Sequence, residues 1–310
     1  MTKKISIIVP CFNEQETIPL FYQAVNALIP QLRDYTLEYI FIDDGSSDNT
    51  LLELQNLNKD NPQNVHFVSF SRNFGKEAAL YAGLQTATGD LVAVMDVDLQ
   101  DPPEQLPLML SGILDEGYEI VGTRRVNRKG EPPIRSFFSI LFYKLMSKIS
   151  DVPMIQGVRD YRLMTRKVVD SILEMSEYNR FSKGIFNWIG FKTKYLEYEN
   201  RDRVAGNTSW SFWKLFRYSI EGIVNFSEVP LLIASFAGFF TFALSILFML
   251  FIIARKIFYG GSVNGWASLV TIIVGLGGVQ LFCLGIVGKY IGNIYLEVKN
   301  RPLYIVKEKK

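Results

Sequence analysis

Two long stretches of the chain contain no charged residue, and they constrain how the rest of it can fold. They are Val229–Ala254 and Trp266–Val287, and the segment between them is short. Each exceeds the roughly 20 apolar residues with which a helix crosses a bilayer about 30 Å thick. We therefore expect an antiparallel hairpin of two transmembrane helices. The alternative is a helical hairpin buried inside a soluble protein.

The charges around this hairpin predict its orientation. Lysine and arginine are enriched in cytoplasmic segments next to membrane helices. Both flanks carry such residues, whereas Arg255 and Lys256 in the connecting loop weaken the rule slightly. No signal-peptide pattern precedes the first predicted strand. These features predict a multi-pass protein of the cell (plasma) membrane, with the part that precedes the hairpin and both termini in the cytoplasm. The flanking cations are Lys214, Arg217, Lys289, Lys299, Arg301, Lys307, Lys309 and Lys310.

The first part of the chain alternates short apolar runs with stretches of helical spacing. The runs are rich in β-branched and aromatic residues and end in polar ones, as strands do. This alternation predicts an α/β, Rossmann-like fold whose mostly parallel sheet is covered by helices on both faces. The predicted strands are Ile5–Val9, Tyr39–Ile42, His66–Phe70 and Leu91–Met95, and the predicted helices are Thr17–Leu32, Thr50–Asn58 and Lys76–Thr86.

Each of the four predicted strands is followed by polar residues. Ligands of such sheets bind beyond the carboxyl ends of the strands, so these residues are the first candidates for a site. One cluster alone could reflect turn chemistry, since Asp and Gly favour turns. Four clusters at one edge predict a ligand site instead. They are Pro10 to Glu14, Asp43 to Asp48, Ser71 to Lys76 and Asp96 to Asp101.

The pair Asp96 and Asp98 suits a nucleotide diphosphate. Carboxylate oxygens bind Mg²⁺ or Mn²⁺, which bridge to substrate phosphates. Such a metal would offset the charge on a departing diphosphate. The chain has no Gly-x-x-x-x-Gly-Lys loop and no Gly-x-Gly-x-x-Gly after its first strand, which argues against an ATPase and a dinucleotide dehydrogenase. The net charge of +2, without an arginine-rich stripe, gives no reason to expect nucleic acid as a partner.

Several motifs resemble those of family 2 glycosyltransferases with the GT-A fold. The run from Asp96 to Pro103, Asp-Val-Asp-Leu-Gln-Asp-Pro-Pro, is similar to the branch that glycosylates polyprenyl phosphates. That branch includes dolichol-phosphate mannose synthases and bacterial undecaprenyl-phosphate glucosyltransferases. The likeness covers nearly the whole chain once the two apolar stretches are included. Its other motifs are Val9-Pro10 with Asn13-Glu14, Asp43 to Ser46, Arg72 to Lys76, Gly122 to Arg125, Asp160 to Leu163 and Arg203 to Trp210.

This resemblance implies roles for the candidate residues. The metal, Mg²⁺ or Mn²⁺, would be held by Asp96, Asp98 and Gln100. The nucleotide would be bound by Pro10, Asn13, Glu14, Asp43, Asp44, Arg72, Lys76 and Asp96. The acceptor phosphate would be drawn into place by Arg124, Arg135 and Arg203, since guanidinium groups suit phosphate geometry. Asp160 is the candidate catalytic carboxylate, together with Arg124 and Arg203.

The role of Asp160 stays open at this point. A phosphate monoester has a second pKa near 6, so the acceptor is mostly dianionic at neutral pH and already nucleophilic. Asp160 would therefore act as a base or only orient the acceptor and the arginines. Its alternative is a plain ion pair with the neighbouring Arg159 or Arg162. Ser209 stands where many relatives have a lysine, which puts one phosphate contact in doubt.

Two segments between the sheet and the hairpin have amphipathic helical spacing. Ile134–Ile149 and Trp210–Phe226 combine aromatic residues with cations, which favours helices that lie in the bilayer interface. A buried core helix is the alternative for the first. The predicted domains are then a nucleotide-sugar-binding core over 1–133, an acceptor-side segment over 134–228, two transmembrane helices over 229–288 and a basic cytoplasmic tail over 289–310.

Together these features predict a membrane-bound inverting glycosyltransferase. It would move a hexose from a nucleotide-diphosphate sugar, by the resemblance a UDP-sugar, to polyprenyl (undecaprenyl) phosphate. The sequence leaves the sugar open. The alternatives are a processive polysaccharide synthase, for which two spans are too few, and a non-catalytic membrane adaptor. Self-association is permitted by small residues in the second apolar stretch, which are Gly275, Gly277 and Gly278.

Overall fold

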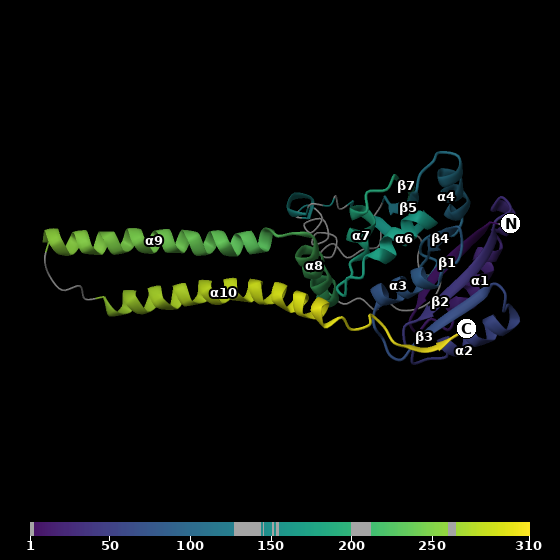
Figure 1. Cartoon of the computed structure of the whole chain (residues 1–310), viewed down its shortest axis with the longest axis horizontal. Helices are drawn as coiled ribbons and strands as arrows, with labels where there is room; N and C mark the ends of the chain where they lie inside the picture. The colour runs from purple at the N-terminus through teal and green to yellow at the C-terminus, as the bar shows by residue number, and fades with distance from the viewer. Residues whose placement is uncertain are drawn as a thin grey trace. The chain divides into compact units, whose positions relative to one another are not determined.

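The computed structural model describes residues 3–126, 144, 146–150, 152, 155–199, 212–259 and 265–310. The chain divides into two compact units. The first unit comprises Met1–Gly222 and Arg301–Lys310, and the second comprises Ile223–Asn300. Figure 1 shows that the first unit contains a sheet with helices around it, and that the second contains two long helices. The chain therefore leaves the first unit once and returns to it after the second.

The described strands of the first unit form one mixed sheet. They are β1 (Lys4–Cys11), β2 (Thr36–Asp43), β3 (Val65–Phe70), β4 (Leu91–Val94), β5 (Ile120–Arg125), β6 (Val158–Thr165), β7 (Thr193–Tyr198) and β8 (Val306–Lys309). Their order is β7-β5-β6-β4-β1-β2-β3-β8. The neighbours among β1 to β4 are parallel, whereas β6 is antiparallel to both β4 and β5, and β8 is antiparallel to β3. The predicted α/β class and the four predicted strands are confirmed.

Helices cover both faces of this sheet. Those described in the first unit are α1 (Thr17–Asn26), the short 3₁₀ helix η1 (Ile29–Gln31), α2 (Thr50–Asp60), α3 (Lys76–Thr86), α4 (Gln105–Leu114), α6 (Arg166–Glu174) and α7 (Ser182–Trp188). Figure 1 shows α1 and α2 on one side of β1 to β3 and α3 on the other. Alternate side chains of a strand face opposite layers. Ile7 accordingly packs in the core with Phe21 of α1, and Ile8 faces Gly83 of α3.

The close contact between β1 and α3 depends on a glycine. A Cβ atom at Gly83 would lie 2.1 Å from Cγ2 of Ile8, which is far inside van der Waals contact. Both residues are buried. The small side chain thus lets α3 approach the sheet, and this approach places the first residue of α3, Lys76, at the carboxyl edge of the strands.

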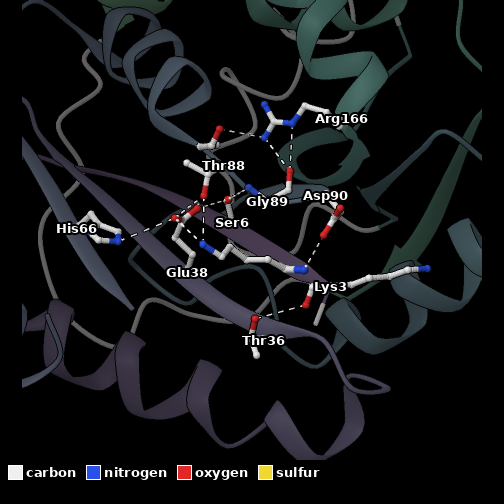
Figure 2. Close-up of polar contacts among 11 residues, drawn as sticks. Lys3, Ser6, Thr36, Glu38, His66, Thr88, Gly89, Asp90 and Arg166 are labelled. Atoms are coloured by element: carbon white, nitrogen blue, oxygen red, sulfur yellow. Dashed lines mark hydrogen bonds and ion pairs between the residues drawn. The ribbon is translucent and has the colours of Figure 1, made fainter. Parts of the chain in front are cut away.

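The opposite, amino-terminal edge of the sheet is held by a buried carboxylate. Figure 2 shows Glu38 of β2 among Ser6, Thr88 and His66. The hydroxyl groups of Ser6 and Thr88 donate to it, the latter at 2.7 Å, and His66 Nε2 lies 3.9 Å away. Burial alone would raise the pKa of Glu38, but the hydrogen bonds from Ser6 and Thr88 keep that pKa below its usual value. This network therefore joins β1, β2 and the loop before β4, away from the candidate site.

The first predicted helix is shorter than expected. The sequence predicts a helix over Thr17–Leu32, but α1 ends at Asn26. Pro30 accounts for the difference, because a proline within a helix removes one hydrogen bond and its ring clashes with the carbonyl four residues earlier. That carbonyl belongs to Asn26, and the chain continues instead as η1.

The second unit contains α9 (Val229–Tyr259) and α10 (Trp266–Lys299). Both are long and apolar enough to cross a membrane by length and composition. No residue of their most apolar windows is buried by the described chain. The two helices contact each other, for example where Cys283 Sγ of α10 donates to Ala234 O of α9 at 3.5 Å. Large apolar side chains on both helices are exposed. Exposing them to water would cost free energy, whereas exposing them to lipid would not.

The second apolar helix continues beyond its uncharged stretch. The predicted tail begins at residue 289, whereas α10 runs to Lys299. Absence of charge marks the part of a helix that lipid can surround, but not where the helix ends. Asn300 ends it in a left-handed conformation with φ of 46°, and Pro302 follows. The remaining residues return to the first unit and form β8.

The two amphipathic segments are described unequally. The structure has α8 (Phe212–Phe226), so the helix predicted over Trp210–Phe226 is present in its described part. Its placement at a bilayer interface stays a prediction. Of Ile134–Ile149, only residue 144 and residues 146–149 are described, and they are helical.

Candidate active site

The carboxyl ends of β1 to β4 meet at one edge, as predicted from the polar residues that follow each strand. Asn13 joins the first two of these ends. Its backbone N–H donates to Ser46 Oγ at 2.9 Å, and its side-chain oxygen accepts from Ser47 N–H at 2.9 Å. Asn13 has a φ of 57°, a left-handed conformation that asparagine tolerates better than most residues. The turn after β1 is therefore shaped to meet the turn after β2.

Glu14 lies between this turn and α1, which begins at Thr17. Its backbone carbonyl accepts from Thr17 N–H at 3.1 Å, and its carboxylate accepts from the Thr17 hydroxyl at 2.7 Å. Its own N–H donates to Thr50 Oγ1 at 2.8 Å. Pro10 lies in β1 opposite Ile42 of β2. Both residues shape the edge where the predicted nucleotide contacts gather, and direct contact with a nucleotide stays a prediction for each.

The two acidic residues at the end of β2 have different surroundings. Asp43 is buried, and its two carboxylate oxygens accept from Ser46 N–H at 2.9 Å and from the Ser69 hydroxyl at 2.7 Å. Asp44 accepts from the backbone N–H groups of Phe74, at 2.7 Å, and Gly75, at 3.0 Å. Burial raises the pKa of Asp44 to about 6, against the lowering effect of these hydrogen bonds. Asp43 thus ties β2 to β3, and Asp44 ties β2 to the loop after β3.

The loop after β3, residues 71–75, closes tightly on the turn after β2. Gly45 has a φ of 69°, and a Cβ atom there would lie 2.3 Å from the backbone carbon of Arg72. The Arg72 guanidinium lies over the Phe74 ring at 4.2 Å and donates to Asn73 O at 3.0 Å. Arg72 therefore folds back on its own loop and leaves the loop backbone against Asp44.

Lys76 joins two carboxylates that are far apart in the sequence. Its Nζ lies 2.7 Å from Asp96 Oδ1 and 2.6 Å from Asp160 Oδ2. The register of the sheet explains the meeting. In the antiparallel pair β4 and β6, Val94 lies opposite Arg162, so continuing this register by two residues brings Asp96 opposite Asp160. The partner of Asp160 is thus Lys76, while Arg162 donates to the Asp160 backbone carbonyl at 3.1 Å.

The charges of this cluster stabilise one another. Burial alone would raise the pKa of Asp160, but the Lys76 ammonium overcomes this and lowers the pKa of the carboxyl well below its usual range. Burial would likewise lower the pKa of Lys76, and the carboxylates of Asp160 and Asp96 raise it above its ordinary value instead. Asp160 is therefore ionised at neutral pH and is a weak base.

The turn after β4 carries the predicted metal ligands. Asp98 is buried, and its Oδ1 accepts from Gln100 N–H at 3.2 Å. Leu99 between them has a φ of 55°, an uncommon conformation for leucine that costs on the order of 1 kcal/mol and persists only where the surroundings impose it. Gln100 Oε1 lies 3.4 Å from a guanidinium nitrogen of Arg159. The turn thus brings Asp98 and the Gln100 side chain to the edge that Asp96 occupies.

A partly buried ion pair supports this turn, and no local sequence pattern predicts it. Arg159 Nε donates to Asp101 Oδ1 at 3.0 Å, and the Tyr198 hydroxyl donates to the same oxygen. Burial raises the pKa of Asp101, although Arg159 opposes that effect. Asp101 belongs to the motif run after β4, but no local pattern assigns it to Arg159, 58 residues away, or to Tyr198, 97 residues away.

The predicted phosphate-binding arginines are only partly described. Arg124 lies in β5, donates from Nε to Gln156 O at 3.1 Å, and has a guanidinium nitrogen 3.6 Å from Glu197. Its side chain is 43% exposed, so it can turn towards a ligand. Arg135 and Arg203 lie outside the described residues. Acceptor binding therefore stays a prediction for all three.

The donor set at this edge fits a hard divalent cation. Two carboxylates and an amide oxygen are the ligands that Mg²⁺ and Mn²⁺ take from proteins, together with substrate phosphates and water. Within the described ranges, no three His, Cys, Asp or Glu side chains are gathered as a complete metal cage. Asp96, Asp98 and Gln100 would hold the ion.

Comparisons with known proteins place this geometry in a family. The sequence profile described as Glycosyl transferase family 2 matches residues 6–173. A Shigella flexneri protein named SfII prophage-derived bactoprenol glucosyl transferase is 43% identical over 305 residues, covering 98% of this chain and 98% of that protein. An Escherichia coli (strain K12) protein named prophage bactoprenol glucosyl transferase homolog is 42% identical over 307 residues, or 99% of each chain.

A solved structure is also similar. Glucosyl-3-phosphoglycerate synthase from Mycobacterium tuberculosis, in complex with Mn²⁺, uridine-diphosphate-glucose and phosphoglyceric acid, has a TM-score of 0.48 and 20% identity. The match covers 72% of this chain and 78% of that one.

The family assignment rests on the profile and the relatives. The profile begins in β1 and ends in α6, so it includes the loops after β1 to β4 and Asp160 of β6. The Shigella flexneri and Escherichia coli relatives match at nearly full length and therefore extend over both apolar helices. The predicted resemblance and the enzyme class, glycosyltransferase, are confirmed. This chain belongs to glycosyl transferase family 2.

Proposed function

We propose that this enzyme transfers a hexose, with glucose as the first candidate, from a nucleotide-diphosphate sugar to a polyprenyl phosphate in a membrane. One observation carries the proposal. The loops after β1 to β4 and the carboxylate of Asp160 converge on one sheet edge, in a chain that also contains two apolar helices of bilayer-spanning length. The names of relatives 42–43% identical over nearly the whole chain support a polyprenyl phosphate as acceptor and glucose as the sugar.

The transfer would proceed by a single displacement. An oxygen of the lipid phosphate attacks the anomeric carbon of the sugar as the bond from that carbon to the nucleotide diphosphate breaks. The bonding electrons leave with the diphosphate, and the configuration at the anomeric carbon inverts. When bound at Asp96, Asp98 and Gln100, Mg²⁺ or Mn²⁺ would neutralise the charge on the departing group. A UDP-sugar is the proposed donor.

Asp160 would orient groups in this reaction and would not carry a proton. The acceptor phosphate has a second pKa near 6 and needs no base at neutral pH. A carboxylate whose pKa is lowered by Lys76 accepts a proton poorly. It is instead well suited to hold the Lys76 ammonium, which also contacts Asp96, at a fixed place beside the diphosphate. Arg124 would meet the acceptor phosphate.

Chain connectivity supports a common side for the catalytic sheet and the tail. The chain leaves the first unit before α9 and returns after α10, and β8 then pairs with β3. Two crossings of a bilayer bring a chain back to the side from which it started. We propose that this side is the cytoplasm, because cations flank both ends of the hairpin.

The product tests the proposal. Purified full-length enzyme in lipid nanodiscs, given UDP-[¹⁴C]glucose, undecaprenyl phosphate and Mn²⁺, is expected to form a labelled product that partitions into organic solvent. Mild acid should release glucose from it, because the sugar is joined through a phosphate ester. Labelled material that stays in the aqueous phase as polymer, or no labelled lipid with any of a panel of donors, would contradict the proposal.

Donor binding is expected to weaken in mild acid. Ionised Asp44 offers two acceptor oxygens to the loop and to a ribose or base, and its pKa is about 6. Protonation removes acceptor capacity, so the dissociation constant for UDP-glucose should rise by up to about tenfold per pH unit below 6. Calorimetry without acceptor isolates the effect, since the lipid phosphate also titrates near pH 6. Asp44→Asn should bind weakly at every pH from 5 to 8. An unchanged slope in that variant would assign the effect elsewhere.

A further inference from the structure

We propose that the C-terminal segment, residues 301–310, is part of the donor site: it positions the loop over residues 71–75 against Asp44. This inference rests on the proposed function, because it assigns that loop to donor binding. The segment follows α10 directly in the chain, yet it belongs to the first unit. It pairs with the outer edge of β3, and Glu308 in it also accepts from Gln55 Nε2 of α2 at 3.0 Å.

Backbone pairing brings the segment to the start of the loop. Phe67 and Lys310 exchange two hydrogen bonds, of 3.1 Å and 3.0 Å. Val306 lies opposite Phe70, and the register shifts between Ser69 and Phe70. Ser71 N–H then donates to Ile305 O at 2.9 Å. The pairing therefore extends one residue beyond the end of β3, into the loop itself.

Tyr304 contacts both sides of the loop. Its ring stacks on Phe70, the residue before the loop, with the ring centroids 4.7 Å apart and the planes 20° apart. Its hydroxyl donates to Gln85 Oε1 at 2.8 Å, and Gln85 belongs to α3, the helix after the loop. The Tyr304 side chain thus contacts both β3 and α3, the two elements that residues 71–75 connect.

Phe74 carries this restraint to Asp44. The Phe70 ring, held by Tyr304, contacts the Phe74 ring edge-on with centroids 5.8 Å apart. The Phe74 backbone N–H donates to Asp44 Oδ1 at 2.7 Å. On its other side the loop meets Gly45 with no room for a Cβ atom. The loop is therefore held between the turn after β2 and the C-terminal segment, and displacing Tyr304 frees one of these two sides.

Covering the edge of β3 is a simpler role for the segment, but it leaves Tyr304 unexplained. An edge strand is protected by backbone pairing alone. Such protection requires neither an aromatic ring stacked on Phe70 nor a hydroxyl bonded to α3. These two contacts act on the loop, and they predict an effect on donor binding that loss of edge cover would not produce.

Steady-state kinetics of the full-length enzyme in nanodiscs test the inference with Tyr304→Ala. We expect the KM for UDP-glucose to rise about fivefold, the factor that corresponds to losing roughly 1 kcal/mol of aromatic contact. The kcat and the KM for undecaprenyl phosphate should stay within twofold. Tyr304→Phe, which keeps the ring, should restore most of the donor KM. Tyr118→Ala makes the same change at a half-buried tyrosine before β5, away from the loop and the C-terminal segment. It is the matched control and should leave the KM for UDP-glucose unchanged.

Hydrogen exchange gives a second measurement that does not depend on turnover. Because coupling between sites is reciprocal, UDP-glucose should slow exchange of the backbone amides in residues 305–310 of the unaltered enzyme. This slowing should be lost in Tyr304→Ala. If that variant folds poorly, Tyr304→Leu, which keeps apolar volume without the ring, carries the kinetic test with an expected rise of about threefold.

Two results would overturn the inference. One is an unchanged KM for UDP-glucose in Tyr304→Ala, together with hydrogen exchange in residues 305–310 of the unaltered enzyme that is the same with and without UDP-glucose. The other is a fall in kcat and thermal stability with no change in donor KM, which would assign the segment to folding only. In both cases the unaltered enzyme would still make labelled lipid, so the proposed function would stand. Failure of the unaltered enzyme to bind or use any nucleotide sugar would reject the proposed function itself.

Discussion

Asp98→Asn is expected to lower the rate of sugar transfer by roughly 10²–10³-fold, the usual effect of removing one group that stabilises the charge of a departing oxyanion. The substitution keeps the shape of the side chain. Its remaining oxygen can still accept from Gln100 N–H, so the turn after β4 should persist. Loss of activity would therefore report loss of a metal-binding carboxylate. The binding of Mn²⁺ in the presence of UDP, measured by electron paramagnetic resonance, should weaken in parallel.

Asp115, at the carboxyl end of α4, provides a control for this experiment. Asp115 caps α4 and pairs with Arg33 on the surface, with both side chains about half exposed. Asp115→Asn makes the same chemical change away from the sheet edge and should leave transfer within twofold, since exposed ion pairs are worth less than about 1 kcal/mol. Undiminished transfer in Asp98→Asn would remove Asp98 from the metal site.

Lys76→Met is expected to reduce transfer by about 10²-fold or more, because a misplaced group at a reacting centre has effects of that size. The variant leaves Asp96 and Asp160 without the ammonium that lies 2.7 Å and 2.6 Å from them. The free energy of unfolding should fall by about 2 kcal/mol, less than for a fully buried pair, because the three side chains are 16–32% exposed. Urea denaturation of the full chain in detergent measures this change.

The double variant Lys76→Met/Asp160→Asn separates stability from catalysis. Removing the Asp160 charge relieves the unpaired carboxylate, so the double variant should be more stable than Lys76→Met by about 1 kcal/mol. The double variant should not regain activity, because both it and Lys76→Met lack the ammonium that positions Asp96. Additive effects on stability would mean that the two side chains do not interact. Recovered activity in the double variant would mean that neither Lys76 nor Asp160 positions the donor.

Local patterns were sufficient for most of the parallel half of the sheet. The apolar run Ile5–Val9 lies within β1, and Leu91–Met95 extends one residue beyond β4. The polar residues that follow these strands meet at one edge, as predicted. Asp96 and Asp98 follow β4 and are candidates because parallel strands present their carboxyl ends at one edge. Their role in metal binding stays a prediction. Pro30 accounts for the early end of α1, because a proline at that position removes a helical hydrogen bond.

The partners of the candidate residues could not be predicted in this way. The resemblance placed Lys76 among nucleotide contacts, and the local alternative for Asp160 was a neighbouring arginine. In the structure Lys76 and Asp160 are 84 residues apart in sequence and form an ion pair. They meet because β6 enters the sheet antiparallel beside β4, and no feature of residues 158–165 alone specifies that strand as its neighbour.

By itself the sequence determined what depends on residues close together in the chain: the strands and helices, the two uncharged stretches, the polar runs at the strand ends and the motifs of the family. Only the tertiary structure decided which distant segments lie side by side. It paired β6 with β4, Arg159 with Asp101, and residues 304–310 with the edge of β3. The physical reason is that secondary structure follows from short-range periodicity and backbone sterics, whereas strand neighbours are chosen by the packing of the whole sheet.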